Sequence, residues 1–204
     1  MIEPLRAFFT AVFTPIARLL LALRVSPDMV TLTGTAGVVV LSLWLVPQGR
    51  FVAAIAGIWA FAICDLIDGT MARMSEHTTP FGAFLDSTLD RIADAAIFSG
   101  VILWYAGEGD DRLGMVLAMY CLVTGSVISY ARSRAESLGY SAKVGLAERA
   151  DRLVLLLFAG LFSVWFDEPR ILVGGLAILA ALSTITVLQR VFHVRRQATA
   201  ASAS

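Results

Sequence analysis

The chain has 204 residues, of which 58% are apolar and only 16% are charged. Sixteen Lys and Arg balance sixteen Asp and Glu, so the chain lacks the basic surplus of a nucleic-acid-binding protein. The apolar content also excludes an intrinsically disordered chain. A mean hydropathy of +0.78 instead predicts an integral membrane protein, in which the charged residues then need an explanation.

Six apolar segments approach or exceed the length of about 20 helical residues that crosses a hydrocarbon core of about 30 Å. They cover residues 29–46, 51–73, 82–105, 112–136, 151–166 and 170–192. Residues 4–24 form a further apolar stripe, interrupted by Pro15, which suits a helix lying at the membrane surface better than a seventh span. We therefore expect an all-α integral membrane protein with six transmembrane helices and an N-terminal amphipathic juxtamembrane helix.

The basic residues predict the orientation of these spans. Most Arg and Lys flank the termini or follow the second and fourth spans, whereas the other loops are mainly acidic. By the positive-inside rule, both termini are then cytoplasmic in a multi-pass protein of the cell membrane. We expect one membrane domain over residues 1–196, with a six-helix bundle at 29–192, and a disordered Ala/Ser-rich tail at 197–204.

Four aspartates gather where the second predicted span ends and the third begins. Asp65 and Asp68 are three residues apart, and Asp86 and Asp90 are four apart, so each pair lies on one helix face. A carboxylate at the bilayer centre costs about 2.5–3.5 kcal/mol, so this group needs a counter-charge. Hard carboxylate oxygens favour Mg²⁺ or Mn²⁺, with charge enough for two ions. Asp94, one turn further, is interpreted as a supporting residue.

Residues near these acids suit a diphosphate. Gly69 lets a ligand approach the backbone, and Arg73 and Thr79 can reach phosphate from the cytosolic side. Two metal ions with a positioned base are a common arrangement for displacement at phosphorus. A divalent-cation transporter is an alternative, but its acids would be distributed across the membrane depth.

Residues 65–90 read Asp-x2-Asp-Gly-x2-Ala-Arg-x8-Gly-x3-Asp-x3-Asp. This pattern resembles the full signature of the CDP-alcohol phosphatidyltransferase family, whose members transfer a phosphatidyl group from CDP-diacylglycerol to an alcohol and release CMP. The resemblance implies a homodimer and two Mg²⁺ ions held by Asp65, Asp68, Asp86 and Asp90, with Asp90 as the general base. The implied CDP-diacylglycerol contacts are Asp28, Met29, Val30, Thr31, Gly69, Arg73 and Thr79. For Asp28, which follows a Ser-Pro helix start, a helix cap is the alternative role.

A second polar group comes from the cytosolic ends of three later spans: Ser129, Arg132, Arg152 and Arg190. Guanidinium groups bind phosphate bidentately, so a phosphorylated acceptor would explain them; alternatively, the arginines only obey the positive-inside rule. The surrounding pattern most resembles actinobacterial members of the family that use myo-inositol phosphate, which implies that these four residues surround that acceptor. Those members more often have Lys at the position of Arg132, so glycerol 3-phosphate is the alternative acceptor.

Overall fold

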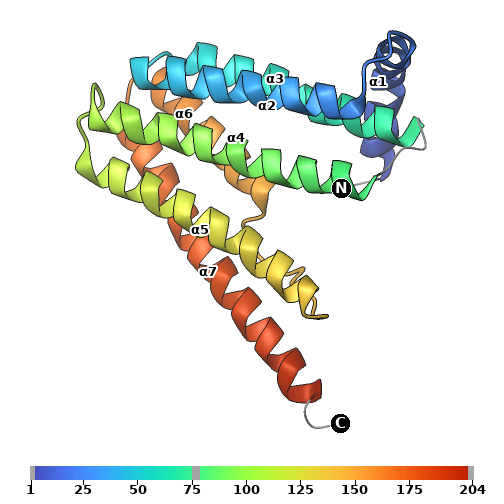
Figure 1. Cartoon of the computed structure of the whole chain (residues 1–204). Helices are drawn as coiled ribbons and strands as arrows, with labels where there is room; N and C mark the ends of the chain where they lie inside the picture. The colour runs from blue at the N-terminus through green and yellow to red at the C-terminus, as the bar shows by residue number, and fades with distance from the viewer. Residues whose placement is uncertain (1–2, 75–78, 202–204) are drawn as a thin grey trace. The chain divides into compact units, whose positions relative to one another are not determined.

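The computed structural model describes residues 3–74 and 79–201, and for residues 3–11, 65, 66 and 72 it describes the backbone alone. The elements in chain order are α1 (Glu3–Ala22), α2 (Pro27–Leu45), the short 3-10 helix η1 (Val46–Gln48), α3 (Phe51–Met74), α4 (Pro80–Ala106), α5 (Arg112–Ser137), α6 (Arg149–Trp165) and α7 (Arg170–Ala201) (Figure 1). These described ranges contain no strand. The prediction of an all-α protein is confirmed.

Within the described ranges, four helical segments are long and apolar enough to cross a membrane: Pro27–Gln48, Phe51–Met71, Arg112–Ser137 and Arg170–Ala201. The other two predicted spans are helices as well. However, α4 contains three aspartates and an arginine, and α6 has only 17 residues. The count of six spans therefore stays a prediction. The helices α2 to α6, which correspond to the first five predicted spans, begin and end within about two residues of the predicted limits.

The N-terminal helix α1 continues through Pro15. Its apolar part, Val12–Ala22, is shorter than a membrane span, and Ile16 and Leu19 are exposed. This is the pattern expected of a helix whose apolar face enters the surface of a bilayer. Its location at a membrane surface stays a prediction.

The last helix is longer than predicted. Residues 197–201, expected to be disordered, continue α7 to Ala201. The side chain of Gln197 accounts for the difference, since its Oε1 accepts a hydrogen bond from the Ser141 N–H (2.9 Å) and its Nε2 donates to the Ser141 carbonyl (2.6 Å). With one side chain anchored, an alanine-rich segment favours helix. The prediction of disorder is thus wrong for 197–201, and residues 202–204 lie outside the described part of the chain.

The chain forms two compact units, one of Met1–Val46 with Ala53–Ile97 and one of Pro47–Val52 with Phe98–Ser204. In the first unit, α2 and α3 approach closely at glycines: a Cβ on Gly34 would lie 2.9 Å from the Cβ of Cys64. In the second unit, α7 packs against both α5 and α6, and Figure 1 shows α5 and α7 side by side.

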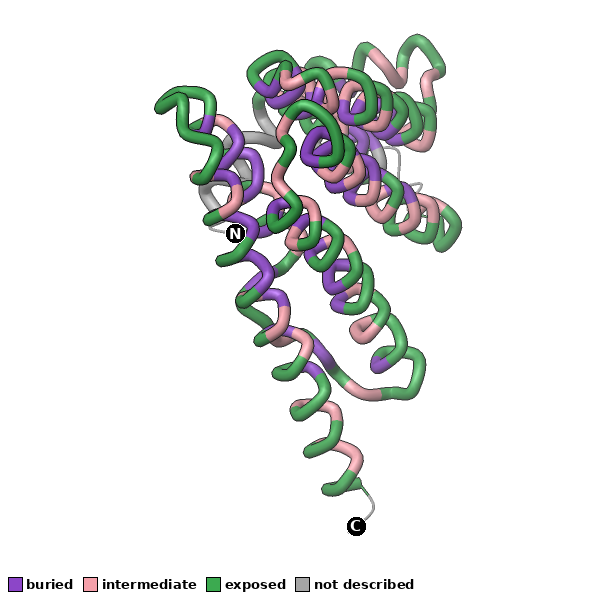
Figure 2. Tube along the Cα trace, turned by 90° about the vertical axis from the view of Figure 1, so that its left-hand side faces the viewer, coloured by how far each residue is buried: buried purple, intermediate pink, exposed green. Residues whose placement is uncertain are grey.

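Buried residues recur along the inner side of α7, where Leu172, Leu176 and Leu179 are almost fully enclosed. Their spacing of four and three residues is that of one helix face. Toward the C-terminus exposed residues predominate, as Figure 2 shows near the end marked C. The second unit is therefore organised around the first two-thirds of α7.

The contact between α6 and α7 depends on Gly175, because a Cβ there would lie 2.5 Å from the Cβ of Ala159. We expect Gly175→Ala to push the two helices apart and to destabilise the protein by about 1–3 kcal/mol, the usual cost of overpacking. Its neighbour provides the control, since a Cβ on Gly174 would meet nothing within 4 Å. Thermal unfolding in detergent checks this: equal melting temperatures for Gly175→Ala and Gly174→Ala would contradict it.

Candidate active site

The start of α2 is held by Ser26, whose Oγ accepts a hydrogen bond from the Met29 N–H (3.2 Å), with Pro27 in the first turn. Ser26 is thus the N-cap residue, and Asp28 is not. The carboxylate of Asp28 lies beside α4, because a Cβ on Gly82 would be 3.4 Å from Asp28 Oδ1. The glycine therefore allows the start of α2 to approach the start of α4.

Thr79 lies at the same place. Its Oγ1 accepts a hydrogen bond from the Gly82 N–H (2.9 Å) just before α4 begins at Pro80, which is the usual arrangement of a helix N-terminus. The same hydroxyl would be 3.2 Å from a Cβ on Gly82. Asp28 and Thr79, predicted separately to contact CDP-diacylglycerol, are therefore neighbours around one glycine.

The structure assigns Thr31 a definite partner. Its hydroxyl donates a hydrogen bond of 2.5 Å to Oδ2 of Asp68 on α3, and both side chains are buried. The same hydroxyl lies 3.1 Å from the carbonyl of Pro27, one turn earlier. Thr31 therefore fixes the orientation of the Asp68 carboxylate, in the way that residues behind a metal ligand do.

The remaining predicted metal ligands are less enclosed. Asp86 is exposed, and Asp90 is half-buried with the guanidinium of Arg91 3.7 Å from its Oδ2. The side chain of Asp65 lies outside the described residues. Among the side chains that are described, no three His, Cys, Asp or Glu residues form a group that could hold a metal ion. The donor chemistry, carboxylate oxygens with one member preoriented by a hydroxyl, fits Mg²⁺ or Mn²⁺, and metal ligation stays a prediction.

Gly69 and Arg73 share one face at the end of α3. Nη2 of Arg73 donates to Oγ1 of Thr70 (3.1 Å), and a Cβ on Gly69 would lie 3.6 Å from Arg73 Nη1. Thr70 thus orients the arginine, a role that the sequence did not indicate. The guanidinium is exposed and can reach a phosphate.

Met29 and Val30, also predicted to contact CDP-diacylglycerol, differ in their surroundings. Met29 is exposed, whereas Val30 packs with Ala17 of α1 and Met71 of α3 in a hydrophobic cluster. The side chain of Val30 therefore holds α2 against α1 and α3.

In the second unit, two of the predicted acceptor residues are almost completely buried: Arg152 is 2% exposed and Arg190 is 3% exposed. Arg195 and Arg196, further along α7, are exposed as expected for residues that serve membrane topology. Burying a guanidinium is costly and needs polar partners. This difference favours a binding role for Arg152 and Arg190 over a purely topological one.

Arg190 has partners on three segments. Nη1 donates to the carbonyl of Ile128 on α5 (2.6 Å), and Nε donates to the carbonyl of Val144 (3.0 Å). Nη2 lies 4.0 Å from Oε1 of Glu148, which precedes α6. Arg190 therefore ties α7 to α5 and to the start of α6.

Arg152 reaches α5 one turn earlier, at Gly125, where a Cβ would overlap the guanidinium. Ser129 directly follows Ile128 on α5, and its Oγ donates to the Gly125 carbonyl (3.2 Å). Arg132, one turn further, is partly exposed and pairs with Glu136 of its own helix (3.2 Å). The structure therefore brings Ser129, Arg152 and Arg190 to one part of α5. The side chain of Arg132 instead pairs with the next turn of its own helix.

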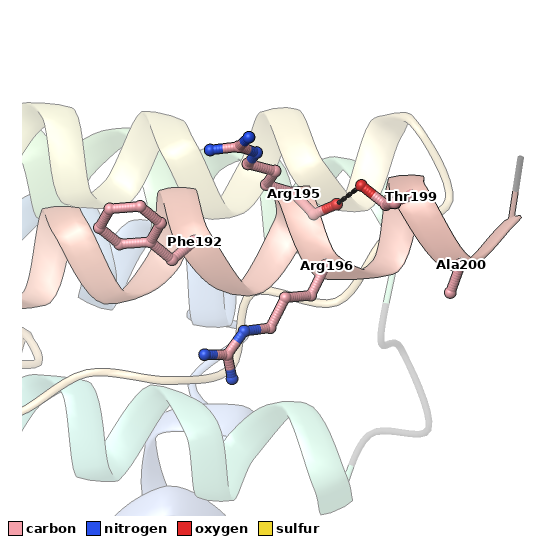
Figure 3. A pocket seen from close by; sticks show the side chains of 5 residues that line it. All are labelled: Phe192, Arg195, Arg196, Thr199 and Ala200. Atoms are coloured by element: carbon pink, nitrogen blue, oxygen red, sulfur yellow. Dashed lines mark hydrogen bonds between the residues drawn. The ribbon is translucent and has the colours of Figure 1, made fainter.

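A surface hollow of about 530 Å³ lies along the end of α7, lined by Phe192, Arg195, Arg196, Thr199 and Ala200 (Figure 3). Figure 3 shows that the two arginine side chains extend to opposite sides of the helix. None of the residues predicted to bind substrate lines this hollow. It is therefore not part of the candidate site.

Comparison with known proteins identifies the family. The family model for CDP-alcohol phosphatidyltransferases matches residues 24–188, most of the chain. This chain belongs to the CDP-alcohol phosphatidyltransferase family. Membership sets aside the alternative of a cation transporter, because this is a family of phosphatidyltransferases.

Several phosphatidylinositol phosphate synthases are similar to this family member over nearly its whole length. The enzyme of Streptomyces avermitilis is 47% identical and covers 98% of this chain and 84% of its own. The enzyme of Mycobacterium tuberculosis H37Rv is 42% identical over 93% of this chain and 88% of its own. A crystal structure of the M. tuberculosis enzyme with CDP-DAG bound has a TM-score of 0.87 at 40% identity, covering 90% of this chain and 94% of that one. Another crystal structure of that enzyme, in complex with manganese and citrate, has a TM-score of 0.86 at 41% identity. This match covers 89% of this chain and 88% of that one.

Since Thr31 orients Asp68, we expect Thr31→Val to weaken Mn²⁺ binding by about tenfold, the lower end of the usual effect of losing such a support. Thr33→Val is the matched control, because the Thr33 hydroxyl bonds only the Met29 carbonyl of its own helix (2.8 Å). Titration of the purified protein with Mn²⁺, followed by electron paramagnetic resonance, measures both affinities. Equal affinities in the two variants would show that Thr31 does not support a metal ligand.

Proposed function

We propose that this chain transfers the phosphatidyl group from CDP-diacylglycerol to myo-inositol phosphate, forming phosphatidylinositol phosphate and CMP. The observation that carries the proposal is 47% identity to the S. avermitilis phosphatidylinositol phosphate synthase over 98% of the chain. The structure of the M. tuberculosis enzyme with CDP-DAG bound supports the choice of donor.

Asp65, Asp68, Asp86 and Asp90 are proposed to hold two divalent cations, Mg²⁺ or Mn²⁺. The support is the carboxylate donor set on α3 and α4, together with the manganese in a structure of the M. tuberculosis relative. When bound, the ions would neutralise charge on the diphosphate as CMP leaves. The donor itself is proposed to contact Asp28, Met29, Val30, Thr31, Gly69, Arg73 and Thr79.

Asp90 is proposed as the general base. Its carboxylate takes the proton of an acceptor hydroxyl, and the hydroxyl oxygen then forms a bond to the β-phosphorus of CDP-diacylglycerol. The bond from that phosphorus to the bridging oxygen breaks, and the oxygen leaves with CMP. The half-buried position of Asp90 supports this role, since a base for a water-soluble acceptor must be reachable from water.

The phosphate of the acceptor is proposed to bind Ser129, Arg132, Arg152 and Arg190. The burial of Arg152 and Arg190 supports this, because two enclosed guanidinium groups from α6 and α7 meet the same part of α5. Free inositol would offer these cations no opposite charge. A phosphorylated alcohol is therefore the acceptor that this arrangement favours.

The enzyme is proposed to lie in the cell membrane with six spans, with residues 1–196 as its membrane domain and the active site and both termini cytoplasmic. Four apolar helices of sufficient length and the distribution of basic residues support this topology. The homodimer implied by the family signature stays a prediction.

The identity of the acceptor is tested by supplying purified protein in CDP-diacylglycerol vesicles with inositol 1-phosphate, free inositol or glycerol 3-phosphate. We expect lipid product and CMP release only with inositol 1-phosphate, because the phosphate is needed to engage the buried arginines. Mass spectrometry of the extracted lipid identifies the product. Product from glycerol 3-phosphate alone would mean that the chain is a phosphatidylglycerophosphate synthase.

Replacing the base gives a second prediction. Asp90→Asn should lower kcat by at least about a hundredfold, the usual contribution of general base catalysis, while the protein still binds Mn²⁺ through its other carboxylates. Asp110→Asn, which removes a charge from the α4–α5 connection, is the control and should leave kcat unchanged. CMP release measures both rates, and undiminished turnover in Asp90→Asn would exclude Asp90 as the base.

A further inference from the structure

Residues 138–148 connect α5 to α6 and are called the α5–α6 loop below. They form a turn followed by irregular main chain, with no helix. Its main chain is nevertheless bound at several points by side chains of one helix face of α7. Thr186, Arg190 and Gln197 provide these bonds, and their spacing of four and seven residues places them on one side of the helix. The loop is therefore attached to α7 rather than left to the solvent.

Thr186 is the most enclosed of the three residues, with no exposed surface. Its Oγ1 accepts hydrogen bonds from the N–H groups of Leu146 and Ala147, both at 3.1 Å, and donates to the carbonyl of Leu182 (2.8 Å). One hydroxyl thus binds two consecutive loop amides, of which that of the buried Ala147 would otherwise lack a partner.

The methyl group of Thr186 also contacts the loop. Gly145 has a φ of +149°, a conformation that favours glycine, and a Cβ there would lie 2.5 Å from Thr186 Cγ2. The loop therefore contacts both the hydroxyl and the methyl group of Thr186, and Gly145 has no room for a side chain.

The bound amides lie directly before the proposed acceptor site. Ala147 is followed by Glu148, the N-cap residue of α6, whose carbonyl accepts the N–H of Arg152 (3.1 Å). The same Glu148 faces Arg190 of α7. Thr186, one turn before Arg190, therefore binds the main chain directly before the first turn of α6.

Many threonines in apolar helices bond only the carbonyl four residues earlier, and such a residue needs no functional explanation. Thr184 is nearly of this kind: it donates to the Ala180 carbonyl (2.8 Å) and its hydroxyl meets that of Tyr120 on α5 (2.7 Å). Thr186 differs because it also accepts two hydrogen bonds from the α5–α6 loop, directly before the helix that contains Arg152.

We propose that Thr186 is a positioning residue for the acceptor-phosphate site, holding the α5–α6 loop so that Arg152 and Arg190 keep the separation that one phosphate requires. The inference rests on the proposed function, since it takes these two arginines to be the phosphate ligands. Thr186 touches no substrate and acts through the two loop amides.

The test compares Thr186→Val, which keeps the shape and removes the hydroxyl, with Thr186→Ser, which keeps the hydroxyl. Thr186→Val is expected to raise the KM for inositol 1-phosphate by about tenfold, equivalent to about 1.4 kcal/mol. Its kcat and its KM for CDP-diacylglycerol should stay within about twofold of the unchanged protein, because the donor site is not involved. Thr186→Ser should restore the acceptor KM.

Thr184→Val is the matched control, because it removes an α7 hydroxyl with one helix-to-helix partner and no contact to the loop. Hydrogen exchange of the peptide containing Leu146 and Ala147 shows whether the loop has been released. If Thr186→Val does not fold, Gly145→Ala moves the loop away from Thr186 and is expected to raise the acceptor KM in the same way.

Three results would overturn the proposal: faster loop exchange with an unchanged acceptor KM, an equal rise in Thr184→Val, or no recovery in Thr186→Ser. Arg152→Ala, measured in parallel, separates this outcome from failure of the proposed function. If Arg152→Ala raises the acceptor KM and Thr186→Val does not, only the role of Thr186 is wrong. If neither changes it, the proposed phosphate site is wrong as well.

Discussion

A charged side chain enclosed by apolar helices needs polar partners, because moving an ion out of water costs several kcal/mol. This constraint applies in each of the two units. The buried carboxylate of Asp68 accepts a hydrogen bond from the Thr31 hydroxyl, and the buried guanidinium of Arg190 donates to two main-chain carbonyls. The partners that make burial tolerable also restrict each charged group to one orientation, which is what a binding site requires.

The formal net charge of zero conceals two separate groups of charges. In the first unit, aspartates of α3 and α4 stand in apolar helices, where a divalent cation is the natural counter-ion. In the second unit, arginines of α6 and α7 are enclosed beside α5, where a phosphate is the natural counter-ion. A donor whose diphosphate binds metal and an acceptor that carries a phosphate together account for both groups.

The sequence predicted the helices well, because apolar length and the Ser-Pro start of α2 are local signals. It failed at Gln197, since the anchoring of that side chain on Ser141 depends on a contact between residues 56 positions apart. For the same reason it did not indicate the bond from Thr31 to Asp68, 37 positions along the chain, and gave Thr186 no role. The acidic signature and the arginines were predictable because isolated charges in apolar runs are conspicuous, whereas the neutral hydroxyls and glycines that orient them are not.

The geometry of Arg190 explains why lysine would not serve at this position. Arginine has five N–H donors in a planar fork, and here Nε and Nη1 each give one to a carbonyl, of Val144 and of Ile128. These two bonds hold the plane of the guanidinium and leave donors on Nη1 and Nη2 for a further anion. A lysine ammonium has three donors around a single atom, so holding both carbonyls would leave one donor and no bidentate geometry. Arginine can therefore join three segments of the second unit and still bind a phosphate.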